Sequence, residues 1–255
     1  MMTVLQTVAV AYSMFSAVPM PQFDWNEKNM RYALCAFPLV GVVCALCWLA
    51  LMLLPLPGFL RGVLFCLAPV AVTGGIHLDG FADTCDALAS HGDPAKKQEI
   101  LKDPHCGAFA VIRLCAYFAL YLALCVTLTP TPRAVICAGF GFVLSRALSG
   151  WAIASLPLAR SSGLAHIFAT AAARRTVRLV LAVLAMALAV AQITVGGLAG
   201  LAMTAAAGLA LRRYACVAKK QFGGISGDLA GWFLQKCELW QLAALVFCQL
   251  LEGWL

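Results

Sequence analysis

The sequence predicts an all-α protein: a polytopic integral membrane helical bundle with about seven transmembrane helices and a further apolar helix at the N-terminus. Of the 255 residues, 63% are hydrophobic and only 11% are charged, whereas a soluble domain carries about 25% charged residues. The mean hydropathy of the chain is +0.90. Several apolar runs reach about 18 residues or more, which is the length that a membrane helix requires. We therefore expect residues 1–255 to form a single membrane-embedded domain.

Seven apolar runs are predicted to span the membrane. In chain order they are Ala33–Leu54, Arg61–Leu78, Ala108–Thr129, Ala134–Leu156, Val177–Val195, Gly197–Leu211 and Leu229–Leu251. Residues Met1–Val18 form another apolar stretch, which either spans the membrane or lies in its interface. The interface is favoured because Gln6, Thr7 and Ser13 add polar groups to this stretch.

The distribution of basic residues supports seven spans. One side would carry Lys28, Arg31, Lys96, Lys97, Lys102, Arg160, Arg174, Arg175, Arg178, Arg212, Arg213, Lys219 and Lys220. The other side would carry only Arg61 and Arg133, and removing any one span would mix the two groups. Because basic loops stay in the cytoplasm, the first side is predicted to be cytoplasmic. The net charge of +7 then reflects topology and does not indicate nucleic acid as a partner.

Six of the eleven acidic residues fall between Asp79 and Asp103. Within this segment Asp79, Asp83 and Asp86 are spaced i, i+4, i+7, which places them on one stripe of a helix. Three like charges on one stripe repel each other and need a counter-charge. Oxygen ligands favour a hard cation such as Mg²⁺, so these three residues are predicted metal ligands. The alternative is a solvated helix end or a set of ion pairs with the lysines that follow.

The predicted position of this stripe is the cytoplasmic rim. Asp79 lies eighteen residues after Arg61, and that distance is about 27 Å along a helix, most of the hydrocarbon core. A charged, water-soluble substrate and Mg²⁺ can both reach the rim. Carboxylates and metal at such a place are typical of phosphoryl chemistry, since the metal neutralises charge on phosphate oxygens.

A short cytoplasmic helix is predicted to follow the stripe. Asp93 is its expected N-cap, Pro94 its first residue, and Pro104 ends it. Glu99 and Asp103 would share one face of this helix. The segment is either part of the site or an amphipathic connector in which Glu99 pairs with Lys102. His77 and His105 are candidates for acid–base work or, alternatively, structural histidines.

The segment before the last predicted span is rich in glycine. Gly223, Gly224, Ser226 and Gly227 precede a helix, and such a turn offers backbone N–H groups and a positive dipole end to a phosphate. Asp228 either caps the helix or supplies a second metal or nucleotide contact.

Arg146, Lys236 and Glu238 are charged residues that lie deep inside predicted spans. Such charges cost several kcal/mol unless they are paired. Lys236 and Glu238 are two positions apart and do not face each other, so each needs a partner on another helix. Structural pairing and substrate contact both remain open. Arg160, which is followed by Ser161 and Ser162, is a candidate phosphate-binding residue.

Four segments in this order resemble the cobalamin synthase family, also called adenosylcobinamide-GDP ribazoletransferases. Residues 74–86 are similar to Gly-Gly-Leu-His-Leu-Asp-Gly-Leu-Ala-Asp-Thr-Ala-Asp, and residues 99–103 with Gly107 are similar to Glu-Ile-Met-Lys-Asp…Gly. Residues 37–41 match Phe-Pro-Leu-Val-Gly. Residues 223–228, with Gly231 and Glu238, are similar to Gly-Gly-x-Thr-Gly-Asp…Gly…Glu. The sequence departs from the family near its N-terminus, where Ser-Ala-Val-Pro replaces Thr-Arg-Ile-Pro, and at residues 104–106 and Trp232.

The resemblance implies a catalytic domain in the cytoplasmic (inner) membrane of a bacterium or archaeon, with its site facing the cytoplasm. The ribose hydroxyl of α-ribazole, or of its 5′-phosphate, would attack the cobinamide-bound phosphorus of adenosylcobinamide-GDP. GMP would leave, with Mg²⁺ as cofactor, in a late step of nucleotide-loop assembly in adenosylcobalamin (vitamin B12). The partners implied are these two substrates and the lipid bilayer, an oligomer being possible.

The residues that would carry this reaction fall into two groups. The catalytic candidates are Asp79, Asp83, Asp86, His77 and Asp228, of which the first three are also the metal ligands. The candidates for binding substrate or phosphate are Glu99, Lys102, Asp103, Arg146, Arg160, Gly223, Gly224, Ser226 and Gly227.

Two other classes of protein were weighed against this one. CDP-alcohol phosphotransferases also place aspartates at a membrane rim, but their signature Asp-Gly-x-x-Ala-Arg…Gly…Asp…Asp fails here, because Asp83-Thr84 takes the Ala-Arg positions. A cation-coupled transporter would use the charges inside the spans as an ion path. It would also place carboxylates near the midplane and contain inverted repeats, whereas these carboxylates are predicted at one rim and no repeat is evident.

Overall fold

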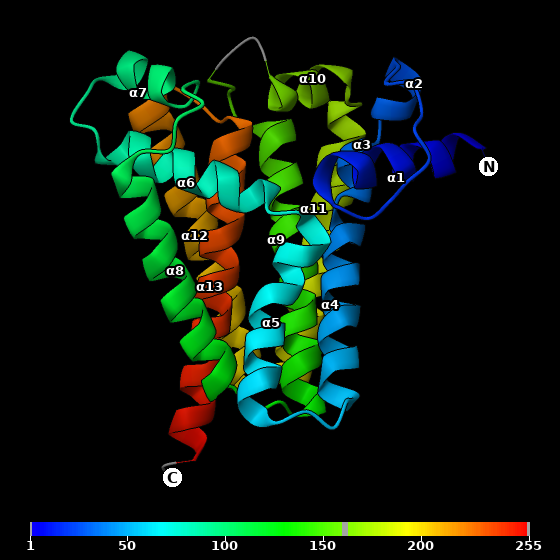
Figure 1. The fold of residues 1–255 in the computed structure, drawn as a ribbon. Helices are drawn as coiled ribbons and strands as arrows, with labels where there is room; N and C mark the ends of the chain where they lie inside the picture. The colour runs from blue at the N-terminus through cyan, green and yellow to red at the C-terminus, as the bar shows by residue number, and fades with distance from the viewer. Residues whose placement is uncertain (1, 160–162, 254–255) are drawn as a thin grey trace.

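The computed structural model describes residues 2–159 and 163–253, and across these ranges the chain is built from helices (Figure 1). The longest are α4 (Pro38–Leu53), α5 (Gly58–Thr73), α8 (Ala108–Thr127), α9 (Pro132–Ser155), α11 (Arg174–Gly196), α12 (Leu198–Phe222) and α13 (Gly227–Glu252). They run side by side in alternating directions, and each overlaps one of the seven predicted spans. The predicted all-α membrane helical bundle is confirmed.

Three of these helices, α8, α9 and α11, are each long and apolar enough to cross a membrane on their own. Up to five spans result when two bent helix pairs are each counted as one. The first pair joins residues 28–36 to α4 with a bend of 41°, and the second joins α5 to α6 (Ile76–Ala89) with a bend of 94°.

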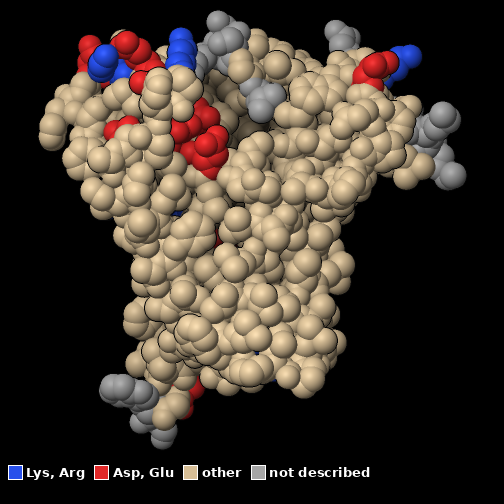
Figure 2. All heavy atoms as spheres, viewed as in Figure 1, with Lys and Arg blue, Asp and Glu red and all other residues tan. Residues whose placement is uncertain are grey.

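The remaining helices gather at one end of the bundle, the upper end in Figure 1. They are α1 (Met2–Phe15), α2 (Glu27–Met30), α3 (Ala33–Ala36), α6, α7 (Pro94–Ile100) and α10 (Leu164–Ala171). Helix α1 lies across the bundle, not along it, as expected for an apolar helix that does not span. Charged side chains are concentrated at this end in Figure 2, while the middle of the molecule shows an uncharged surface.

The second predicted span, Arg61–Leu78, is wrong at its end. Helix α5 stops at Thr73, and Gly74 and Gly75 have φ angles of 64° and 81°. Two consecutive left-handed residues cannot continue a right-handed helix, and glycine adopts this region without the clash of a Cβ atom. The chain therefore turns, and α6 crosses the end of the bundle (Figure 1). Asp79 reaches the bundle end because of this turn and not by continuing a straight helix.

The sixth predicted span, Gly197–Leu211, is too short. Helix α12 continues for eleven residues to Phe222 because Tyr214, Ala218 and Phe222, spaced four apart, are all buried against the bundle. The basic residues of this extension lie in its exposed part.

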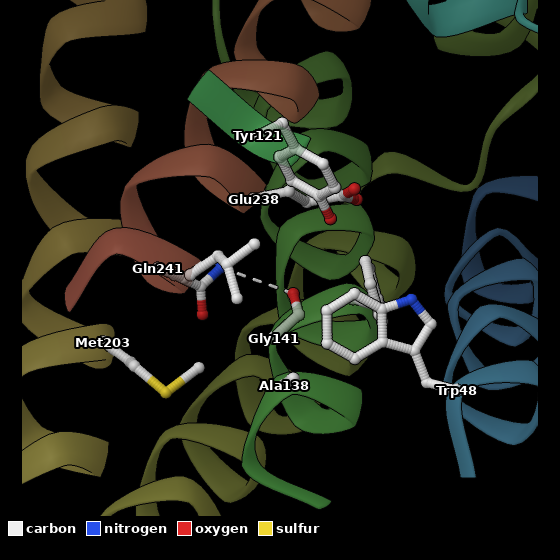
Figure 3. A pocket seen from close by; sticks show the side chains of 9 residues that line it. Trp48, Tyr121, Ala138, Gly141, Met203, Glu238 and Gln241 are labelled. Carbon is white, nitrogen blue, oxygen red and sulfur yellow. Dashed lines mark hydrogen bonds between the residues drawn. The ribbon is translucent and has the colours of Figure 1, made fainter. Parts of the chain in front are cut away.

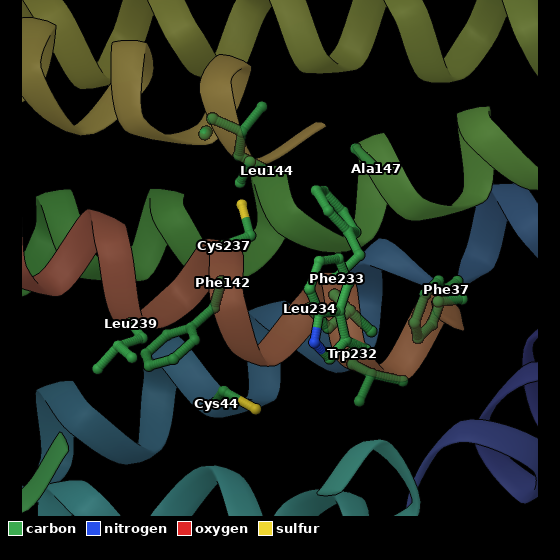
Figure 4. Close-up of a cluster of buried hydrophobic side chains, with 14 of the residues drawn as sticks. Phe37, Cys44, Phe142, Leu144, Ala147, Trp232, Phe233, Leu234, Cys237 and Leu239 are labelled. Carbon is green, nitrogen blue, oxygen red and sulfur yellow. The ribbon is translucent and has the colours of Figure 1, made fainter. Parts of the chain in front are cut away.

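The core lies between α9 and the helices packed against it, α4, α11 and α13. Figure 4 shows Phe142 and Leu144 of α9 in one apolar cluster with Phe233 and Cys237 of α13. Closer to α5, the buried Trp48 side chain donates from Nε1 to the carbonyl oxygen of Phe65, at 2.9 Å. The apolar faces of four helices are thus joined into one packed interior.

Arg146 and Glu238, which are buried inside the bundle, form an ion pair. Arg146 Nη1 lies 2.6 Å from Glu238 Oε1, and the two side chains are 1% and 5% exposed. Lys236 lies over the ring of Phe81 on α6, 5.8 Å from its centroid. Each charge therefore has the partner on another helix that the sequence required. Arg146 is engaged with Glu238 in the interior, which corrects its assignment as a phosphate-binding residue.

A small pocket next to this ion pair is shown in Figure 3. Gln241 donates to the carbonyl oxygen of Gly141 at 3.4 Å, and Glu238 and Met203 also line the pocket. Its volume is about 10 Å³, room for about one water molecule. The polar groups at mid-bundle are thus packed against each other.

Candidate active site

Helix α6 carries the predicted acidic stripe. Asp79, Asp83 and Asp86 all lie within this helix, so the i, i+4, i+7 arrangement on one stripe is confirmed. Asp79 is exposed, while Asp83 and Asp86 are half-buried. Figure 2 shows acidic side chains on the surface over α6.

Two glycines bring α6 against the start of α13. A Cβ atom on Gly80 would lie 2.8 Å from the Cα atom of Asp228, and one on Gly231 would lie 2.8 Å from the carbonyl oxygen of His77. The two backbones therefore approach more closely than any other residue would allow. The consequence is that Asp228, from the other end of the sequence, joins the carboxylates of α6. Nothing in the local spacing identified this role for the two glycines.

The charges of Asp79, Asp228 and Asp86 all act on Asp83. The pKa of Asp83 is raised to about 6, first because of burial and then because of the neighbouring charges of Asp79, Asp228 and Asp86. In the described part of the chain no ion pair involves Asp79, Asp83 or Asp86. The predicted alternative of lysine pairing is therefore wrong. The two lysines bind other residues. Lys96 pairs with Glu99 at 2.9 Å, and Lys97 donates to Gln221.

The predicted cage of three aspartates is not preassembled. No three Asp, Glu, His or Cys side chains of the described residues gather closely enough to hold a metal ion. The carboxylate of Asp86 lies against Gly107 instead. A Cβ atom built on Gly107 would lie 2.1 Å from Asp86 Oδ2. Gly107 is the N-cap of α8, where the positive end of the helix favours a carboxylate. Asp79 and Asp83 remain suited to Mg²⁺, which usually takes one or two carboxylates and completes its shell with substrate phosphates and water.

The cap of α13 is Ser226 and not Asp228. Ser226 Oγ accepts a hydrogen bond from the backbone N–H of Leu229 at 3.3 Å. Asp228 lies in the first turn of the helix, with Oδ2 3.5 Å from Ser226 Oγ. The capping alternative for Asp228 is therefore wrong, because the residue two positions earlier already fills that role.

The glycine-rich turn is less open than predicted. The backbone N–H of Gly224 donates to Ala218 and that of Ile225 donates to Pro157, at 3.0 and 2.8 Å. A Cβ atom on Gly224 would lie 2.5 Å from the carbonyl carbon of Leu158. Gly224 thus serves to dock this turn on the segment after α9, and Gly223 ends α12 with φ of 77°. Gly227 is exposed and lines a cavity, so it stays a candidate for substrate contact.

Two cavities flank α6. The aromatic cavity, of about 410 Å³, is lined by Phe15, Phe37, Ile76, His77, Asp79, Gly80, Leu101, Ser149, Ile153, Gly163, Ala165, Phe168, Ser226, Gly227, Asp228, Ala230, Gly231 and Leu234. The outer cavity, of about 550 Å³, is lined by Gly74, Gly75, Ile76, Leu78, Asp79, Ala82, Asp83, Pro104, Cys106, Leu114 and Phe118. Asp79 belongs to the wall of both cavities. The carboxylates therefore stand at the boundary between two spaces, an arrangement that suits a reaction between two substrates.

His77 is buried in the wall of the aromatic cavity. Its pKa is lowered to about 3, first by burial and then by the charge of Arg146. Burial therefore keeps the imidazole neutral. Its Nε2 atom is buried without a hydrogen-bond partner, which suits a residue that binds a ligand group.

The segment after α7 is the most exposed part of the predicted site. Asp93 caps α7 as predicted, accepting from the N–H of Lys96. The helix ends at Ile100, so Glu99 and Asp103 do not share a helix face. Asp103 Oδ1 accepts from the backbone N–H of His105 at 3.0 Å and lies 2.7 Å from His105 Nδ1, and these two contacts, the backbone one first, lower the pKa of Asp103.

Glu99, Lys102 and Asp103 are exposed, and in the described ranges none of them lines either cavity. Pro104 and Cys106 of the same segment do line the outer cavity. Arg160 lies outside the described residues. Sequence reasoning missed Phe15, Ser149 and Phe168, which come from three separate helices and carry no local motif.

Comparison with known proteins confirms the resemblance seen in the motifs. A family model described as cobalamin-5-phosphate synthase matches residues 7–246. A protein of Lachnoclostridium phytofermentans named adenosylcobinamide-GDP ribazoletransferase is 41% identical, covering 96% of this chain and 95% of its own. Proteins of the same name from Geobacillus kaustophilus and Clostridium perfringens are 32% and 29% identical; each covers 91% of this chain, and 92% and 94% of its own. No solved structure matches the chain. With nearly the whole sequence matched, the chain belongs to the cobalamin-5-phosphate synthase family of membrane-embedded transferases in cobalamin biosynthesis.

Proposed function

We propose that the protein joins adenosylcobinamide-GDP to α-ribazole, or to its 5′-phosphate, with release of GMP. The names of the relatives supply both substrates. The observation that carries the proposal is the group of carboxylates at the α6–α13 crossing, where Asp79 lies on the wall between two cavities. Each cavity offers space for one reactant, and the acids stand where the two reactants would meet.

The proposed reaction is a displacement at phosphorus. An oxygen–phosphorus bond forms between the ribose hydroxyl and the phosphate attached to cobinamide, and the bond from that phosphorus to the GMP oxygen breaks. The hydroxyl proton is lost and GMP departs with the bonding electron pair. The chemistry depends mainly on positioning and on balancing charge.

We assign the charge balance to Asp79 and Asp83. These two carboxylates would hold Mg²⁺ together with the substrate diphosphate, and the ion would supply neutralisation of the phosphate charge. Asp228, on the wall of the aromatic cavity, is placed to orient the attacking hydroxyl or to take its proton. The raised pKa of Asp83 supports this assignment, because it reflects first the burial of this carboxyl and then the neighbouring negative charges of Asp79, Asp228 and Asp86.

We also propose that the site faces the cytoplasm. The two basic residues at the opposite end, Arg61 and Arg133, donate to the carbonyl oxygens of Leu54 and Val195. The other basic loops of the described chain lie at the site end (Figure 1). By the positive-inside rule that end is cytoplasmic.

The direct test is a GMP-release assay with the full chain purified in detergent. GMP should appear when adenosylcobinamide-GDP, α-ribazole and Mg²⁺ are all present. Omitting α-ribazole, or adding EDTA, should abolish its release. No GMP from the complete mixture would refute the proposed reaction, whereas undiminished release in EDTA would refute only the metal requirement.

A further inference from the structure

We propose that the aromatic cavity is the binding site for the base of the ribazole substrate, and that it discriminates against the guanine of the other substrate. This inference rests on the proposed function and adds to it which reactant occupies which side of α6. It is carried by the shape of the cavity, by two unpartnered polar atoms in its wall and by the position of the carboxylates.

Three phenylalanine rings form one side of the cavity. The centroid of the Phe15 ring lies 4.3 Å from that of Phe37 and 5.2 Å from that of Phe168. Phe37 and Phe168 are 2% and 1% exposed. Phe15 belongs to α1, Phe37 directly precedes α4, and Phe168 belongs to α10. The segments at the end of the bundle therefore close this side of the cavity. A wall of this kind favours a flat, apolar ring.

Two residues of the same wall each carry a buried polar atom that has no hydrogen-bond partner among the described residues. His77 Nε2 and Ser149 Oγ are both buried without a hydrogen bond, and the two residues are 6% and 0% exposed. Buried polar groups in proteins are nearly always hydrogen-bonded, because leaving one unpaired is costly. A ligand that supplies one or two matching atoms would satisfy both residues.

The base of ribazole has the matching chemistry. A dimethylbenzimidazole is a flat bicycle with two methyl groups and one unsubstituted ring nitrogen, which accepts a hydrogen bond such as that of a serine hydroxyl. Guanine carries several donors and acceptors around its edge, and most of them would be left unpaired against phenylalanine rings. The volume of about 410 Å³ suits a nucleoside, because pockets for molecules of drug size start at about 300 Å³.

The carboxylates fix the orientation of the bound nucleoside. Asp79, Ser226 and Asp228 line the same cavity as the phenylalanines. With the base against the rings, the ribose lies toward these polar residues. Asp79 also lines the outer cavity, together with Asp83, so the ribose hydroxyl would face a diphosphate held on the other side of α6. The ribose hydroxyl would then reach the phosphorus on the side opposite the departing GMP oxygen, as an in-line displacement requires.

The test measures binding of α-ribazole by equilibrium dialysis, with the full chain in detergent and without the second substrate. Ser149→Ala removes one hydroxyl from a buried helix position and should raise the Kd for α-ribazole about tenfold, which is about 1.4 kcal/mol. Its affinity for GDP should stay unchanged. Ser155→Ala is the matched control, because Ser155 Oγ is also buried and unpartnered but is absent from both cavity walls.

Phe168→Leu provides a second variant, which keeps the wall apolar but removes a ring, and it should also weaken α-ribazole selectively. Equal Kd values for α-ribazole in Ser149→Ala and the wild type would overturn the inference, as would an absence of binding in the wild type or a selective loss of GDP binding. The readout is independent of turnover. Selective weakening in a protein that releases no GMP would therefore sustain the assignment of the cavity while refuting the proposed reaction.

Discussion

Among single residues, Asp83 shows the clearest consequence of the crowded carboxylates. Its folded-state pKa is raised to about 6, so the folded protein keeps a proton that the unfolded chain loses near pH ~3.9. Between these two values the unfolded state binds fewer protons, and stability falls as the pH rises. Above the folded-state pKa of Asp83, the stability that this proton contributes is lost completely.

A divalent cation should offset this loss. We expect Mg²⁺ to raise the melting temperature more at about pH 7.5 than at about pH 5, because the carboxylates bind the cation when they are ionised. Thermal unfolding in EDTA and in Mg²⁺ at both pH values measures the effect. Asp83→Asn should remove most of the pH dependence, and an equal Mg²⁺ effect at the two pH values would contradict the predicted site.

Replacing either metal-ligand candidate should abolish most activity. Asp79→Asn and Asp83→Asn keep the shape of the side chain and remove its charge, so GMP release should fall at least ~100-fold, or ~2.7 kcal/mol. Asp93→Asn is the matched control, because Asp93 only caps α7 and asparagine is an equally good cap. Near-normal turnover of both site variants across a Mg²⁺ titration would remove them from the site.

At Asp228 the structure separates capping from catalysis. Ser226 makes the cap, so Ser226→Ala should cost about 1 kcal/mol of stability. Asp228→Ser and Asp228→Asn should lose GMP release although Ser226 still caps the helix, since neither side chain carries a charge. Wild-type turnover in Asp228→Ser would exclude a catalytic role for this residue.

At the scale of elements, the crossing of α6 and α13 decides whether the site exists. Gly80→Ala and Gly231→Ala would each place a Cβ atom 2.8 Å from backbone atoms of the other helix. Backbone atoms cannot rotate away, so the helices must separate, at a cost of about 1–3 kcal/mol. Both variants should be less stable and nearly inactive.

The control for the crossing is another helical glycine. Gly208 lies within α12, and nothing lies within 4 Å of a Cβ atom built there. Gly208→Ala should therefore be neutral or slightly stabilising, because alanine is the better helix former. Thermal unfolding and GMP release of the three variants make the comparison. Equal behaviour of Gly80→Ala and Gly208→Ala would refute the role given to the crossing.

At the scale of the whole molecule, the charge asymmetry predicts orientation. The loops that hold Lys96 and Arg174 should be cytoplasmic, and the loop that holds Arg133 should be outside. Single cysteines introduced at these loops into a cysteine-free variant would be labelled with a membrane-impermeant reagent in intact cells. Labelling of the Lys96 and Arg133 positions from the same side would rule out seven spans.

The sequence alone determined the membrane bundle, the alternation of its helices, and the stripe of Asp79, Asp83 and Asp86 on one helix. These features follow from local properties. Hydropathy is set by each run of residues, and the helical period relates positions only a few residues apart. The same reasoning showed that Arg146 and Glu238 needed partners, but it could not show that they are each other's partner.

Tertiary structure alone decided how these parts meet. Gly74 and Gly75 signal a possible break, but only the packing of α6 across the bundle end fixes its direction. The approach of Asp228 to Asp83, and the enclosure of one cavity by Phe15, Phe37 and Phe168, join helices that are distant in the chain. No short-range pattern encodes such contacts, because they depend on which helix faces pack together once the whole bundle has formed.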